Sequence, residues 1–164
     1  MQQVKKVIVL AVRACRRFAL EPGTSFLMVR MAGWVWVLSI VVKVWPLPKA
    51  LALITTSSRT RAEASLQHQQ YLAATLDKIL KTRWYCLTPV CWKRAAVLHR
   101  YLALNGTTTK IVFGMRKSDN GTMQGHAWLE LDGRPILETD TPEYTVTYKF
   151  PSDGQFEMEL ASLD

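Results

Sequence analysis

The sequence predicts an α+β fold, in which N-terminal helices precede a cysteine-bearing helix packed on an antiparallel sheet of three to five short strands. Apolar residues recur at helical spacing between residues 91 and 102. After Gly106 the pattern changes to β-branched and alternating stretches, and Asp132-Gly133 is a strong hairpin signal. This change of period is the basis for the predicted fold class.

Size and charge limit the kinds of protein this chain can be. Its 164 residues make up one domain's worth of chain. We expect a helical region at 1–58, a linker at 56–58 and a core at 59–164. The net charge of +8 indicates an acidic partner or surface, but no nucleic-acid motif accompanies it. An odd number of cysteines indicates a reducing interior, and we expect a cytoplasmic protein, peripheral to the membrane at most.

The first 20 residues predict an amphipathic helix with basic residues between its apolar positions. A signal peptide is the rival interpretation, because Lys5-Lys6 precede an apolar stretch. That stretch stops at Arg13 and no small-residue cleavage site follows, so we reject the signal-peptide interpretation.

Residues 24–55 are the most hydrophobic part of the chain. Arg30 and Lys43 bracket only about a dozen uncharged residues, fewer than the ~20 that a membrane-spanning helix needs. Pro46 and Pro48 then interrupt the stretch. We expect a helix that is buried on most sides or that lies against a membrane surface or a partner protein, and both alternatives stay open.

A further helix is predicted at 61–81, and its inner face repeats at helical spacing. This face consists of Leu72, Leu76, Ile79 and Leu80. The basic residues near its end suit a helix C-terminus and need no ligand to explain them.

Cys91 has surroundings that favour a thiolate, the reactive form of the side chain. Thr88 is a good N-cap and Pro89 suits the first helical position, so Cys91 would lie in the first turn of a helix. There, free backbone N–H groups and nearby Lys93 and Arg94 favour negative charge. A lone cysteine is more often a small buried hydrophobic residue, so this feature needs support from elsewhere.

The residues after the cysteine helix predict strands at 107–114, 125–131 and 134–140, with a polar loop at 116–124. Further strands are expected at 144–148 and 155–160. In the second hairpin, a three-residue bulged loop places His126 opposite Asp140 and diagonal to Glu138. A two-residue loop places it opposite Thr139 instead. The sequence leaves both registers open.

Cys91, His126 and an acid in that chain order are the components of a thiol nucleophile with a histidine base. His99 is a poor substitute base, because eight residues along the same helix separate it from Cys91 by roughly 12 Å. His68 lies in a polar, Gln-rich segment. Cys86 and Cys91 lack a second ligand pair at metal spacing, and we expect no metal or nucleotide cofactor.

One combination of segments resembles the transglutaminase-like core of lasso-peptide maturation peptidases. It consists of Cys91-Trp92-Lys93-Arg94-Ala95-Ala96-Val97-Leu98, Leu102, Asn105-Gly106, residues 111–114 and Gly125-His126-Ala127-Trp128-Leu129-Glu130. The resemblance covers about residues 83–142. It implies a papain-like core and a Cys-His-Asp triad that removes the leader peptide from a ribosomally made precursor.

The resemblance makes Cys91 the nucleophile and His126 the base. Glu138 stands where that family usually has Asp, so either Glu138 or Asp140 is expected to be the acid. The implied partners are the precursor leader peptide, a separate leader-recognition protein and an ATP-dependent macrolactam synthetase. Two other functions stay open: an acyltransferase or amidase with the same triad, and a non-catalytic module that binds a partner.

Overall fold

The computed structural model describes residues 22–56, 65–81, 91–138, 140 and 142–152. The predicted helix at 1–20, the end of the linker at 57–58, the cap at Thr88 and Pro89, and the strand at 155–160 lie outside these residues. The helices are α2 (Pro22–Val44), α3 (Leu47–Ala52), α4 (Leu66–Lys81) and α5 (Cys91–Leu104). The strands are β1 (Lys110–Lys117), β2 (Met123–Leu131), β3 (Arg134–Ile136) and β4 (Thr145–Phe150).

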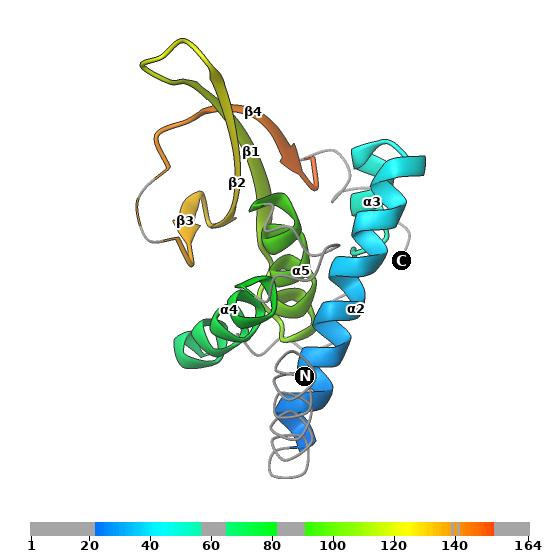
Figure 1. Ribbon diagram of the computed structural model, residues 1–164. Helices are drawn as coiled ribbons and strands as arrows, with labels where there is room; N and C mark the ends of the chain where they lie inside the picture. The colour runs from blue at the N-terminus through cyan, green and yellow to red at the C-terminus, as the bar shows by residue number, and fades with distance from the viewer. Residues whose placement is uncertain (1–21, 57–64, 82–90, 139, 141, 153–164) are drawn as a thin grey trace, which may run out of the picture.

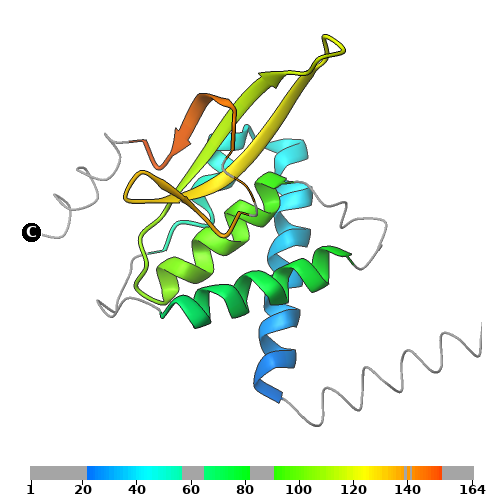
Figure 2. The ribbon, with the colours of Figure 1, turned by 90° about the vertical axis from the view of Figure 1, so that its left-hand side faces the viewer.

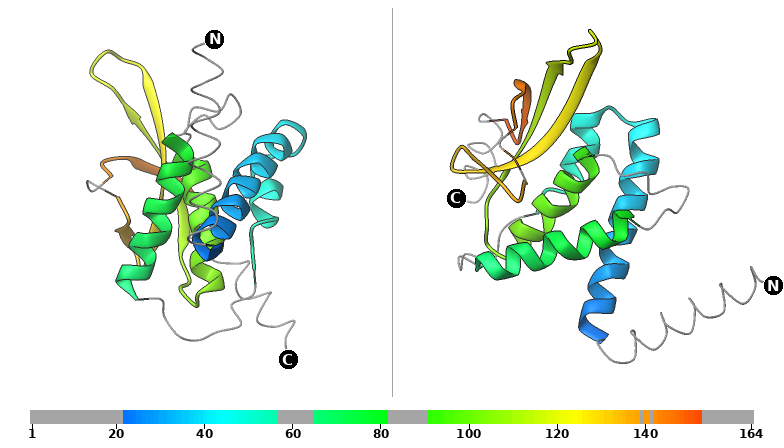
Figure 3. Two further views of the ribbon diagram at one scale, coloured as in Figure 1. Left: turned by 60° about the horizontal axis from the view of Figure 1, so that its bottom comes forward. Right: turned by 60° about the vertical axis from the view of Figure 1, so that its left-hand side comes forward.

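The four strands form one antiparallel sheet in the order β3-β2-β1-β4, and the helices lie on one side of it (Figures 1 and 2). Helix α5 lies between the sheet and α2, while α4 packs beside α5 (Figure 3). The predicted α+β class is confirmed. The chain crosses from β3 at one edge to β4 at the other, a connection that strand patterns alone did not predict.

The cysteine-bearing helix forms the centre of the core because its apolar stripe faces the sheet and α4. Ala95, Leu98 and Leu102 are all at most 2% exposed. The helix ends at Leu104, and Gly106 has φ 83°, the left-handed conformation of a helix C-terminus. Both features confirm the sequence prediction, as does the burial of all four residues of the inner face predicted for α4.

Helices before and after the predicted linker share one hydrophobic core. Met31, Val35 and Leu38 repeat at helical spacing on α2 and pack with the core residues of α4 and α5. Leu51 and Ile54 belong to the same cluster. Within the described residues, the N-terminal helices therefore help to hold the cysteine helix in place.

The opposite face of α2 is apolar and exposed. Its large side chains are Phe26, Val29, Trp36, Val37, Ile40 and Val44. The expectation of a helix buried on most sides is thus wrong, because only one side packs on the protein. The argument that this stretch is too short to span a membrane also fails, because the helix continues past Arg30. Gly23–Val44 forms 22 helical residues, long and apolar enough to cross a membrane. Some core helices of soluble proteins have the same length and composition. Contact with a membrane or a partner stays a prediction.

The β1–β2 hairpin is longer than predicted. The expected loop at 116–124 is shorter in the structure, because residues 116–117 and 123–124 belong to the strands, Lys117 pairs with Met123, and Ser118 to Gly121 forms the turn. The Arg116 guanidinium donates to Gln124 Oε1 across the hairpin at 3.2 Å. The polar sequence correctly indicated exposure, but exposed residues can still pair across an antiparallel ladder.

His99 gives stability a pH dependence that can be measured. It is 6% exposed and its Nδ1 lies 3.0 Å from Thr109 Oγ1. Burial lowers its pKa from 6.5 to about 4, against the smaller raising effect of a hydrogen bond with the Thr109 backbone. The unfolded chain therefore binds a proton that the folded chain does not, and stability falls as pH falls from 6.5 toward 4. At 1.36 kcal/mol per pKa unit, we expect a loss of roughly 3 kcal/mol in unfolding free energy.

Urea unfolding of the wild type at several pH values between 4 and 7.5 measures this loss. His99→Gln should flatten the curve in that range, whereas His68→Gln, on α4, should keep the wild-type slope. Identical slopes for the wild type and His99→Gln would contradict a neutral, buried His99.

Candidate active site

Cys91 is the first residue of α5 and lies partly exposed at the wall of a pocket. The pocket has a volume of about 590 Å³. Residues of α3, α5, β1, β2 and β4 line it: Leu47, Pro48, Cys91, Trp92, Phe113, Gly114, Met115, Gly125, His126, Ala127, Thr147 and Tyr148. The thiol and His126 thus border the same space, whose other walls are mainly apolar.

His126 lies on β2 and packs against two aromatic rings, Trp128 and Tyr144, which also contact each other. The imidazole stacks at 19° on Trp128, with 6.0 Å between centroids, and its centroid lies 5.4 Å from that of Tyr144. Its partner across the ladder is Gly114 on β1. A Cβ atom on Gly114 would lie 2.7 Å from Tyr144 Cβ and 2.9 Å from the Trp128 ring, closer than side chains approach one another. The absence of a side chain at Gly114 therefore lets both rings sit against the imidazole.

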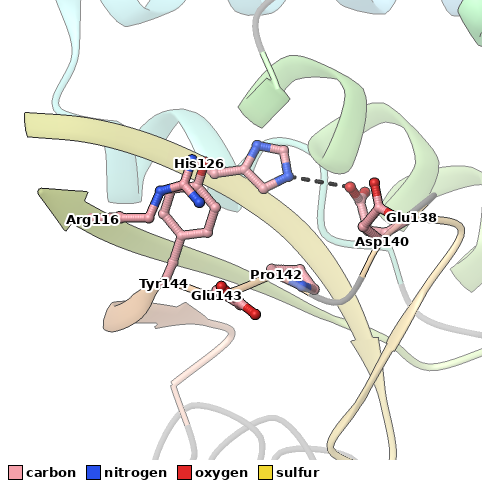
Figure 4. Close-up of a pocket in the computed structure, with 7 residues that line it drawn as sticks. All are labelled: Arg116, His126, Glu138, Asp140, Pro142, Glu143 and Tyr144. Atoms are coloured by element: carbon pink, nitrogen blue, oxygen red, sulfur yellow. Dashed lines mark hydrogen bonds and ion pairs between the residues drawn. The ribbon is translucent and has the colours of Figure 1, made fainter. Parts of the chain in front are cut away.

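Glu138 is the acid that reaches His126. Its Oε2 lies 3.2 Å from His126 Nε2. Figure 4 marks this contact with a dashed line. The glutamate is 17% exposed and the histidine 29%, so solvent only partly screens the pair. This contact leaves Nδ1 as the ring nitrogen available to a thiol.

The hairpin register alone would not have produced this contact. Asp132 and Gly133 both have positive φ and form a two-residue turn, so Leu131 pairs with Arg134 and Leu129 with Ile136. The bulged three-residue loop is therefore wrong. The predicted strand at 134–140 stops at Ile136, because Leu137 adopts φ 58° and turns the chain out of the ladder, which brings Glu138 to the imidazole.

Asp140, the other expected acid, is exposed and borders a second pocket of about 390 Å³ (Figure 4). This pocket is lined by Arg116, His126, Glu138, Asp140, Pro142, Glu143 and Tyr144. Within the described residues, Asp140 makes no hydrogen bond to His126. The geometry therefore favours Glu138 over Asp140 as the partner of the ring.

The thiol of Cys91 is not hydrogen-bonded to His126 in the described part of the chain, although both border the same pocket. Such contacts are often long without substrate and tighten in the reactive complex. Chemically, the arrangement provides a nucleophile at the first turn of a helix, whose dipole favours negative charge, and an imidazole held by a carboxylate. Among the described residues, no three His, Cys, Asp or Glu side chains gather as metal ligands would.

Two contributions to the site escaped sequence reasoning. Arg94 was expected only to add positive charge near the thiol, but it contacts Glu138 directly, with Nη1 3.1 Å from Oε1. Its position one helical turn after Cys91 was the available signal. Leu47 and Pro48 of α3 also form part of the pocket wall, and no local sequence signal connected them to Cys91.

Comparison with known proteins gives one match. The family model described as the transglutaminase-like superfamily matches residues 34–149, a span from within α2 to within β4 that includes Cys91, His126 and Glu138. No curated protein and no solved structure matches the chain significantly.

Proposed function

The chain belongs to the transglutaminase-like superfamily, and from this premise we propose that it is a cysteine peptidase that removes the leader peptide from a lasso-peptide precursor. Members of the superfamily are often cysteine peptidases or acyl transferases, which supports the chemistry in its coarse form. The finer assignment is supported by the residues that resemble lasso-peptide maturation peptidases. The observation that carries the proposal is the His126–Glu138 contact at the edge of the pocket that Cys91 borders.

In the proposed reaction, His126 Nδ1 accepts the thiol proton of Cys91 and the thiolate attacks the carbonyl carbon at the end of the leader. Glu138 holds the ring through Nε2 and stabilises the imidazolium. The tetrahedral intermediate collapses, the C–N bond breaks, and His126 returns the proton to the departing amine. Water then attacks the thioester with His126 as base, and the leader leaves with a free carboxylate.

An extended peptide suits the shape of the sheet beside the site. Strand β3 pairs with β2 only at residues 129–131. In the described part of the chain, no strand therefore covers residues 123–128 on that side of β2. A free strand edge beside His126 offers main-chain hydrogen bonds to an added peptide strand.

Cleavage of a precursor in vitro tests the proposal. The purified chain, a separate leader-recognition protein and the precursor are incubated together and analysed by mass spectrometry. Release of an intact leader and a core peptide supports the proposal, and an unchanged precursor contradicts it. The ATP-dependent macrolactam synthetase is the proposed next enzyme, because it would consume the free amine of the core peptide.

The two other candidate functions make different predictions in the same mixture. With an added primary amine, an acyltransferase would pass the acyl group from the Cys91 thioester to the amine, whereas a peptidase would release the acid. A non-catalytic binding module would leave the precursor intact and alkylate at Cys91 no faster than at Cys15 or Cys86.

We also propose that the exposed face of α2 contacts an anionic membrane surface. Apolar side chains along this face combine with exposed Arg30 and Lys43, a composition that binds lipid interfaces carrying negative charge. We expect cosedimentation with phosphatidylglycerol-containing vesicles, but not with phosphatidylcholine vesicles, and weaker binding at high salt.

A pair of variants makes this vesicle test specific to α2. Trp36→Glu combined with Ile40→Glu should abolish the binding. Met123→Glu, at an exposed apolar position on the hairpin, should leave it intact. Equal binding by both variants would rule out this face as the contact.

A further inference from the structure

The side chain of Arg94, on α5, makes four contacts with three residues from two other parts of the chain. Its Nε lies 2.7 Å from Asp77 Oδ1 and its Nη2 3.4 Å from Asp77 Oδ2, which ties it to α4. Nη2 also donates to the Leu137 carbonyl at 3.0 Å, and Nη1 donates to Glu138 Oε1 at 3.1 Å. A planar guanidinium can satisfy several acceptors in fixed directions, which a lysine ammonium cannot do.

Glu138 divides its two carboxylate oxygens between two partners. Oε1 accepts from Arg94, and Oε2 lies against His126 Nε2. Since the carboxylate is planar and rigid, the direction of the first bond limits the direction of the second. The orientation of the imidazole therefore depends on Arg94 through one intervening side chain.

The backbone beside Glu138 depends on the same arginine. Leu137 has φ 58°, a conformation that residues with side chains seldom adopt and that the surroundings must hold in place. Its carbonyl accepts a hydrogen bond from Arg94, which itself is anchored by Asp77. This fixes the bend that carries Glu138 out of the strand and toward His126.

Arg94 and Cys91 lie on the same helix, and the offset of three positions between them corresponds to almost one helical turn. We propose that Arg94 is a positioning residue of the triad: it fixes Glu138 and His126 relative to the helix that carries the nucleophile. This inference rests on the proposed function. It adds that the base and acid are aligned by α5 and α4 rather than by the loop on which Glu138 lies.

The test compares variants of the full-length chain in the precursor cleavage assay. Arg94→Gln should lower kcat by roughly 10- to 100-fold, because small displacements of a catalytic group cost about that much, with little change in KM. Arg94→Lys should recover only part of the loss. Asp77→Asn should give a smaller loss, because it removes the anchor and leaves the contact with Glu138.

A matched ion pair away from the site provides the control. Lys149 Nζ lies 2.8 Å from Glu130 Oε2 and joins β4 to β2. Lys149→Gln removes a partly buried charge pair of the same kind, so its kcat should stay at the wild-type value. If Arg94→Gln and Lys149→Gln lower the melting temperature equally and both retain full kcat, Arg94 is only structural and the inference is overturned.

A double-mutant cycle separates action through Glu138 from action by another route. If Arg94 works through Glu138, then Arg94→Gln should have almost no further effect on kcat in a Glu138→Gln chain. If the losses in kcat of the two single variants multiply in the double variant, the inference is overturned. If Arg94→Gln fails to fold, the same cycle is run with Arg94→Lys.

The outcomes also separate this inference from the proposed function. Full kcat in Arg94→Gln, together with an inactive Cys91→Ala, overturns the positioning role alone. Full cleavage by Cys91→Ala overturns the proposed peptidase itself.

Discussion

Replacing Cys91 with alanine is expected to abolish precursor cleavage, with a loss of at least about 10⁴-fold in kcat. The thiolate is the atom that forms the new covalent bond, so no neighbouring group can replace it. His126→Ala should cause a similar loss, since without a base the thiol keeps its proton and the departing amine receives none. Single-turnover cleavage followed by mass spectrometry measures both effects.

The remaining cysteines and histidines of the chain provide controls for this result. Cys15→Ala, Cys86→Ala and His68→Gln should each cleave at the wild-type rate. The alkylation rate of Cys91 by iodoacetamide, determined by peptide mapping, should fall in His126→Ala. Full cleavage by Cys91→Ala or His126→Ala would show that the pocket is not the site of the reaction.

The second large effect is expected at the acid. Glu138→Gln should lower kcat by roughly 10²- to 10⁴-fold, because an amide cannot stabilise the imidazolium and holds the ring in a different protonation pattern. Asp140→Asn should change kcat only slightly, since Glu138 and not Asp140 contacts the ring. The comparison uses two carboxylates two residues apart, so general effects of lost charge cancel.

The opposite order of losses would assign the acid role to Asp140. That result would mean that the chain between Leu137 and Asp140 rearranges when substrate binds. Equal and small losses would show that neither carboxylate orients the base.

Local sequence patterns predicted the helices of the core well, because burial acts on residues a fixed few positions apart. The stripe of Ala95, Leu98 and Leu102, and the helix end before Gly106, needed only helical periodicity and the conformational freedom of glycine. The hairpin turn at Asp132 was likewise a local signal.

The details of the site depended on contacts that no local pattern contains. Counting residues along two strands assumed that the second strand continued to Asp140, whereas the backbone leaves the ladder at Leu137. That bend is held by Arg94, 43 residues earlier in the chain. A register argument can place side chains only as far as the pairing lasts.

The apolar stretch of α2 shows a second limit of sequence reasoning. Periodicity could not divide its faces, because apolar residues surround the helix, and the structure shows that only the side with Met31, Val35 and Leu38 is packed. Composition states how much apolar surface a helix has, but tertiary contacts decide which part of it is covered.

Gly114 has a final consequence for how this site tolerates change. The space that a side chain at Gly114 would occupy must stay empty. Even one methyl group there would push Tyr144 or Trp128 away from the imidazole. A residue without any reactive group is therefore restricted as tightly as those that handle protons. The empty space opposite His126 is therefore a functional feature of the site. Filling it would displace the rings that pack on the histidine, although it would remove none of the histidine's own hydrogen bonds.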